Sequence, residues 1–164
     1  MAKVIARPPA GGLYQEDFPL WAERQAALLR AKRFDELDLE NLIEEVEDLS
    51  RRERDRVESH VESILEHLLQ LERSNATTPR RGWLVTVDRQ RAQLGRKLTT
   101  TLRHHLEGEL PAVYAGLRRP LARQLEKDHA PADALPAGCP YTLDQILDPD
   151  WYPEHGHDSK DPAP

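Results

Sequence analysis

Apolar residues recur at spacings of three and four along most of the chain, which is the period of an α-helix. The strongest pattern consists of two successive apolar stripes, Leu39, Leu42, Ile43, Val46 and Leu49 and then Val57, Val61, Ile64, Leu65, Leu68 and Leu71. At about 100° per residue, Val57 lies only about 20° around the helix axis from Val46, so both stripes share one face. We therefore predict one long helix from about Asp38 to Glu72.

A competing signal stands between the two stripes. Ser50 to Glu53 has the Ser-x-x-Glu spacing of a capping box, a pattern that often starts a new helix. Because the apolar stripe keeps its phase across this polar gap, we prefer the continuous helix. A bend near Ser50 is left open.

Three further helices and one short terminal helix are predicted from the same periodicity. They cover about 14–31, 82–98, 100–127 and 142–147. Asp17 is expected to cap the first of them, because a short carboxylate accepts hydrogen bonds from the free amides of a first turn. Pro111 and Pro120 should bend or interrupt the helix over 100–127, since each removes a backbone donor. Thr142 and Gln145 have capping-box spacing ahead of the short helix.

These elements predict an all-α fold, a helical bundle of about four main helices with one long central helix and a short C-terminal helix. The length of 164 residues fits a single domain, which we expect over 13–153. The Pro- and Gly-containing segment 1–12 should be a flexible lead, and the polar segment 154–164 a disordered tail.

Composition narrows the class of protein. The formal net charge of -6 argues against a dedicated nucleic-acid binder, because phosphates are held chiefly by Lys and Arg. The single cysteine, Cys139, gives no reason to place the chain in an oxidising compartment. The sequence has no apolar run long enough to span a membrane and no signal-peptide pattern. We expect a soluble, cytoplasmic protein without a membrane role.

The charges are nevertheless segregated along the chain. The segment 35–48 carries eight acids and no base, whereas the segment 80–103 carries seven bases and one acid, Asp88. The basic segment could contact nucleic acid, with Trp83 available to stack on a base. The alternative that we favour is that this helix packs against the acidic one or is solvated.

Several sequence segments resemble a known family. They are Tyr14-Gln15-Glu16-Asp17-Phe18-Pro19-Leu20-Trp21, Phe34-Asp35-Glu36-Leu37-Asp38-Leu39-Glu40-Asn41-Leu42-Ile43-Glu44-Glu45-Val46-Glu47, His67-Leu68-Leu69, Trp83, Gln90-Arg91 and Cys139-Pro140-Tyr141-Thr142-Leu143-Asp144-Gln145-Ile146-Leu147-Asp148. Together they resemble the family called domain of unknown function twenty-nine, from about Tyr14 to Pro153. The resemblance implies an all-helical fold in a bacterial protein and no particular activity. Gln70-Leu71 departs from the Lys-Trp pair usual in that family.

The long helix carries a row of ionisable residues beside its apolar stripe. Glu53, His60 and His67 recur every seven residues, so neighbours lie about 10 Å apart along the axis. That distance is too long for one metal ion unless another helix supplies ligands. Glu53 and His67 match the family pattern, and His60 does not.

Arg91 lies in the middle of the apolar face formed by Val87, Leu94 and Leu98. A guanidinium buried there needs a partner, because an unpaired buried charge is costly. We predict an ion pair between Arg91 and Glu53, whose main role would be to fix helix register. The candidate residues for a buried polar site are accordingly Glu53, His67 and Arg91.

No established catalytic motif is present. The acids Glu44, Glu45, Glu47 and Asp48 lack the Glu-x-x-His spacing of di-iron bundles, so we interpret them as a solvated acidic face. We expect no cofactor and no metal. Long amphipathic helices with segregated charge favour a non-catalytic protein-interaction module, with an unknown protein partner or self-association. The alternatives are a nucleic-acid-associated protein acting through segment 80–103, and a metal-dependent hydrolase or nuclease using Glu53, His67 and a residue from another helix.

Overall fold

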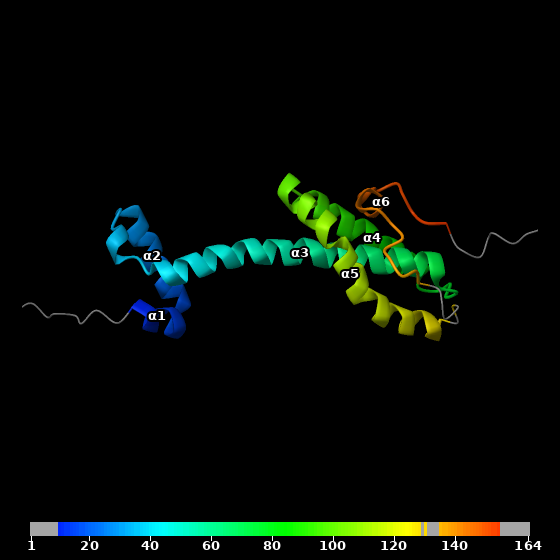
Figure 1. Ribbon diagram of the computed structural model, residues 1–164, viewed down its shortest axis with the longest axis horizontal. Helices are drawn as coiled ribbons and strands as arrows, with labels where there is room; N and C mark the ends of the chain where they lie inside the picture. Colours follow the sequence, from blue (N-terminus) through cyan, green and yellow to red (C-terminus); the bar gives the residue numbers. More distant parts are fainter. Residues whose placement is uncertain (1–9, 129, 131–134, 155–164) are drawn as a thin grey trace, which may run out of the picture. The chain divides into compact units, whose positions relative to one another are not determined.

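The structure is a computed structural model that describes residues 10–128, 130 and 135–154. Within these residues it contains helices and no strand, which confirms the all-α prediction. In chain order the elements are α1 (Ala10–Glu16), α2 (Phe18–Arg30), the 3-10 helix η1 (Phe34–Glu36), α3 (Leu39–Arg73), α4 (Arg80–Gly95), α5 (Thr100–Lys127) and α6 (Leu143–Leu147), as Figure 1 shows.

The chain divides into two compact units. Unit 1 covers residues 1–52 and unit 2 covers residues 53–164, so the boundary falls inside α3. Unit 1 therefore contains α1, α2, η1 and the first part of α3. Unit 2 contains the remainder of α3 with α4, α5 and α6.

The long helix is continuous. α3 has 35 residues and passes through Ser50 without a break, which confirms the single long helix and rules out a new helix starting at the capping-box pattern. It begins one residue after the predicted start and ends one residue after the predicted end. The apolar period, which keeps its phase across Ser50, indicated the helix more reliably than the four-residue cap pattern.

The first predicted helix is wrong in one respect, because two helices stand in its place. Asp17 separates α1 from α2, with φ −149° and a side-chain oxygen that accepts from the amide of Leu20 at 3.1 Å. The predicted cap at Asp17 is thus confirmed, and it starts a new helix. α1 begins at Ala10, inside the segment 1–12 expected to be an irregular lead, of which residues 1–9 lie outside the described residues.

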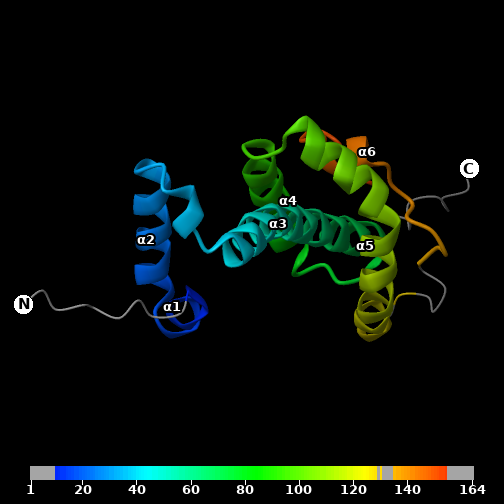
Figure 2. The same cartoon turned by 60° about the vertical axis from the view of Figure 1, so that its left-hand side comes forward.

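The helices of unit 2 lie close to their predicted bounds. α5 spans the predicted 100–127 and contains Pro111 and Pro120 without interruption, although the ribbon changes direction along its length (Figure 2). α6 begins with the predicted capping box: the Thr142 hydroxyl accepts from the amide of Gln145, and the Gln145 side chain accepts from the amide of Thr142. The predicted tail 154–164 lies outside the described residues except for Glu154.

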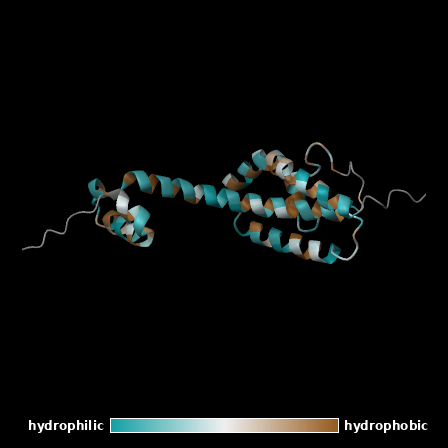
Figure 3. Ribbon diagram, turned by 90° about the horizontal axis from the view of Figure 1, so that it is seen from below, coloured by the Kyte–Doolittle hydropathy of each residue, from teal (hydrophilic) through white to brown (hydrophobic). Residues whose placement is uncertain are grey.

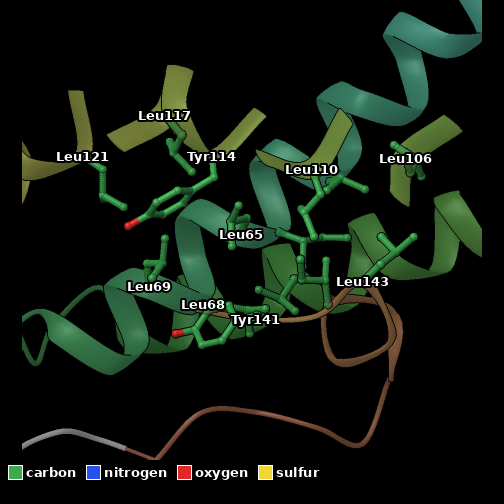
Figure 4. Close-up of a cluster of buried hydrophobic side chains, with 14 of the residues drawn as sticks. Leu65, Leu68, Leu69, Leu106, Leu110, Tyr114, Leu117, Leu121, Tyr141 and Leu143 are labelled. Carbon is green, nitrogen blue, oxygen red and sulfur yellow. The ribbon is translucent and has the colours of Figure 1, made fainter. Parts of the chain in front are cut away.

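The hydrophobic core of unit 2 forms around the second apolar stripe of α3. Val57, Val61, Ile64, Leu65 and Leu68 are almost fully buried. They belong to a cluster with side chains of α4, α5, α6 and the segment before α6, part of which Figure 4 shows: Val87, Leu94, Leu106, Leu110, Tyr114, Leu117, Leu121, Leu125, Leu135, Tyr141, Leu143 and Ile146. Among the described residues, no helix combines the length and the apolar character needed to cross a bilayer.

Candidate functional site

Glu53 does not face a buried site. Its side chain is 48% exposed, and its carboxylate oxygen lies 2.6 Å from Nη1 of Arg56, one turn further along α3. The predicted ion pair between Glu53 and Arg91 is therefore wrong. Glu53 pairs with a neighbour on its own helix, whereas Arg91 bonds to residues near the end of the described chain.

Arg91 is buried, as predicted, and its guanidinium is held by backbone carbonyl groups. Nε donates to the carbonyl oxygen of Ile146 at 2.9 Å, and Nη2 donates to those of Gln145 and Trp151 at 3.2 and 2.9 Å. The Arg91 guanidinium carbon also lies 4.9 Å from the centre of the Tyr152 ring. Removal from water lowers the pKa of Arg91, and the nearby Tyr152 and Asp88 oppose that shift.

The position of these acceptors explains why no carboxylate is needed. Gln145 and Ile146 lie in the last turn of α6, where carbonyl groups have no partner inside the helix and carry partial negative charge. One guanidinium has several N–H donors, so it can donate to more than one of these carbonyl groups. Arg91 thereby attaches the C-terminal segment to α4, which is a structural role.

His67 is half-buried and also has a local partner. Its Nδ1 lies 2.8 Å from Oε1 of Gln70, so the ring donates to the amide oxygen. The neighbouring member of the predicted row, His60, makes the corresponding contact with Gln90 at 2.6 Å. Within the described part of the chain, no three or more His, Cys, Asp or Glu side chains are grouped so that they could hold a metal ion. Glu53, His67 and Arg91 are not brought together.

The basic segment 80–103 does not present all of its charge to solvent. Arg91 is buried, and Arg103 pairs with Asp144 and with Glu107. The exposed bases are Arg81, Arg89, Arg96 and Lys97. Trp83 is half-buried, so its ring is only partly available for stacking.

The most unusual surface lies in unit 1, on the first apolar stripe of α3. Leu39, Ile43, Val46 and Leu49 are 56%, 58%, 64% and 60% exposed. We call these four residues the α3 apolar face. Hydrophobic positions recur along this part of α3 in Figure 3, between longer hydrophilic stretches. Large aliphatic side chains are usually the most buried in a protein, so four in succession on one exposed face is uncommon.

Beside this face, Glu45 of α3 contacts α1, and it lies about 40° around the helix axis from Leu49. Glu45 accepts a hydrogen bond from the Tyr14 hydroxyl at 2.7 Å. This contact raises the pKa of Tyr14 to about 12, because a hydroxyl that donates to a carboxylate resists losing its proton. Glu45 therefore joins α3 to α1, while the four residues of the α3 apolar face stay exposed.

A buried polar network fixes the start of α3 in this orientation. The carboxylate of Asp38 accepts from the indole nitrogen of Trp21 at 3.1 Å and from the Asn41 amide at 2.8 Å. The backbone amide of Asp38 donates to Oε1 of Gln25 at 2.9 Å. All three bonds involve Asp38, the residue just before α3. Two of them join it to buried side chains of α2, and the third joins it to Asn41 in the first turn of α3. The rotation of α3 about its axis in unit 1 is thereby set.

Sequence reasoning found the apolar stripe and did not find its exposure. Periodicity shows that a helix has an apolar side, and it does not show whether anything packs against that side. The available signal was the set of polar residues between the apolar positions, which includes family-pattern residues Asn41 and Glu45. These polar residues proved to be the intramolecular contacts.

The described residues define an all-helical protein with an apolar helix face exposed in one unit and a packed core in the other. The model of one family, Domain of unknown function DUF29, matches residues 13–152. The chain belongs to this family. No curated protein and no solved structure matches it.

Proposed function

We propose that the protein is a non-catalytic protein-interaction module and that its contact surface is the α3 apolar face. The observation that carries this proposal is the exposure of Leu39, Ile43, Val46 and Leu49, each more than half accessible to water. Full burial of a Leu, Ile or Val side chain is worth roughly 1.5–3 kcal/mol. Covering four that are half exposed would contribute several kcal/mol, which is a substantial part of a typical binding free energy.

The small core of unit 1 supports the same proposal. Among its described residues, Trp21 and Leu28 are the only buried hydrophobic ones. Further large apolar groups of this unit are exposed, including Phe18, Leu29 and Phe34. A unit of this size with so little buried apolar area usually gains stability from a partner, because its own core is too small.

The proposal is tested by capture of partners from the native host with three forms of the full chain. The double variant Ile43→Gln/Val46→Gln removes apolar area from the α3 apolar face without changing charge. The matched control Leu84→Gln/Val85→Gln changes two exposed apolar residues on α4 in the same way. Wild type and control should retain the same specific partner, and the α3 variant should lose it.

Far-UV circular dichroism and thermal unfolding would establish that all three forms are folded. Both pairs of substitutions replace exposed residues, so both variants should unfold within a few degrees of the wild type. Retention of the same proteins in the same amounts by the α3 variant would refute the proposed function.

A further inference from the structure

We infer that the α3 apolar face binds a basic amphipathic helix of another protein. This inference rests on the proposed function and adds the chemistry of the partner. The α3 apolar face occupies one side of a helix over about three turns, which is a surface that another helix can cover with apolar residues at i, i+3 or i+4, and i+7.

Exposed acids follow one edge of the α3 apolar face. At 100° per residue, Glu40 and Glu47 lie within about 60° of Ile43 around the axis and two turns apart from each other. Both are exposed, as is Glu44 behind them. By contrast, Glu45 is engaged with Tyr14. The edge that a partner would meet is therefore acidic.

The nearest bases on α3, Arg51 and Arg52, pair with Asp48 and Glu45, and not with Glu40 or Glu47. The segment 35–48 contains no Lys, Arg or His. A partner helix with Lys or Arg beside its apolar stripe would place them against Glu40 and Glu47. Opposite charges at the rim of an apolar contact favour the correct partner and speed its association.

A second copy of this chain fits the surface less well. A parallel pair of these helices would align each glutamate with its own copy, and an antiparallel pair that overlaps the whole face would set the acidic segment 40–48 against itself. One helix could instead be shifted along the other until its acids reach the arginines of its copy, Arg51, Arg52, Arg54 and Arg56. Ile43 would then lie opposite this charged segment and would lose its apolar contact. Each arrangement therefore either brings like charges together or separates the apolar residues of the two copies.

The test uses three synthetic peptides of about 18 residues, long enough for five helical turns. One has Leu at i, i+4, i+7 and i+11 with Lys at the flanking positions. The second keeps the Leu positions and has Glu at the flanks. The third has the composition of the first in a scrambled order without a stripe. Binding of each labelled peptide to the full chain is measured by fluorescence anisotropy at several salt concentrations.

The Lys-flanked peptide should bind at least about tenfold more tightly than either of the others, a difference of one order of magnitude in Kd. Ile43→Gln/Val46→Gln should weaken it by a similar factor, and Leu84→Gln/Val85→Gln should not. Glu40→Gln/Glu47→Gln should reduce both the affinity and its dependence on salt, because it removes the acidic edge while leaving the apolar residues in place.

Four results would overturn the inference. Equal binding of the Glu-flanked peptide would show that the partner chemistry is wrong, while the proposed function would still stand on the host-capture comparison. Equal binding of the scrambled peptide would show attraction by charge alone. A concentration-dependent dimer in sedimentation, abolished by Ile43→Gln/Val46→Gln, would identify a second copy as the occupant. Absence of stripe-dependent peptide binding, with unchanged capture by that variant, would refute both proposals.

Discussion

At the scale of single residues, Arg91 shows how a buried guanidinium can be held by backbone carbonyl groups without a direct ion pair. Its donors reach carbonyl oxygens of Gln145, Ile146 and Trp151, which are 54 to 60 residues away in the sequence. Charge-assisted hydrogen bonds of this kind contribute more than neutral ones. The guanidinium is suited to the task because it presents several donors in a fixed plane, whereas a lysine presents one ammonium group.

Arg91→Lys should therefore destabilise the protein even though the charge is kept. The ammonium cannot reach all three carbonyl groups, and the acceptors left unpaired should cost about 1–3 kcal/mol. The free energy of unfolding, measured in urea by far-UV circular dichroism, checks this. Arg89→Lys, on the exposed side of the same helix, is the control and should be neutral. Equal stability of the two variants would show that the carbonyl contacts contribute nothing.

At the scale of the elements, α3 is a helix whose two halves are used in opposite ways. In unit 2 its apolar side forms the core, and in unit 1 Glu45 bonds to α1 while four apolar side chains stay exposed. The stripe that the sequence shows as one continuous face thus consists of a buried half and an exposed half. The hydrogen bond from Tyr14 to Glu45 is part of what keeps the exposed half outward.

The pH dependence of Tyr14 tests this contact directly. Its pKa in the folded chain is about 12, against an ordinary value of 10.0, chiefly because its hydroxyl donates to Glu45. A group whose pKa is raised by folding stabilises the fold below the pKa of the unfolded chain. That contribution is lost as the pH rises through the folded value, here between about 10 and 12.

Glu45→Gln should lower the pKa of this one tyrosine towards its ordinary value, because an amide accepts the hydrogen bond without a negative charge. Ultraviolet difference titration of wild type against variant should show one phenol moving down. Glu44→Gln is the matched control, since Glu44 is only a neighbouring charge for Tyr14 and not its hydrogen-bond partner. Identical titration curves for wild type and Glu45→Gln would argue against the described packing of unit 1.

Local features of the helices could be predicted from the sequence, because they depend on near neighbours in the chain. The cap at Asp17, the capping box at Thr142 and the continuity of α3 through Ser50 are of this kind. The break between α1 and α2 was missed, because the apolar period runs across it. The partner of Arg91 could not be predicted, since it depends on where a helix end 55 residues away comes to pack.

At the scale of the whole molecule, the acidic and the basic segments of the sequence differ in how the structure uses them. The acidic segment 35–48 contains three of the four residues of the α3 apolar face, Leu39, Ile43 and Val46, together with its acidic edge. The basic segment 80–103 includes one buried arginine that serves the fold and one that pairs within unit 2. The acidic segment is the better candidate for recognition, because it combines charge with exposed apolar area.

Membership of the DUF29 family covers most of the chain and assigns no activity to it. The match to the DUF29 model covers residues 13–152, which include both the Asp38 network and the carbonyl contacts of Arg91. In this chain, these two groups of contacts have clear structural roles. The α3 apolar face has no such intramolecular role among the described residues, and a binding role is what we propose for it.

The claim that the α3 apolar face is a binding surface is tested most directly by photo-crosslinking in the native host. A benzophenone amino acid is introduced at Val46, and at Val85 as a control of similar exposure. We predict a discrete crosslinked species with another protein from position 46 and none from position 85. Crosslinks from position 46 that stay within the same chain, or match those from position 85, would contradict the account.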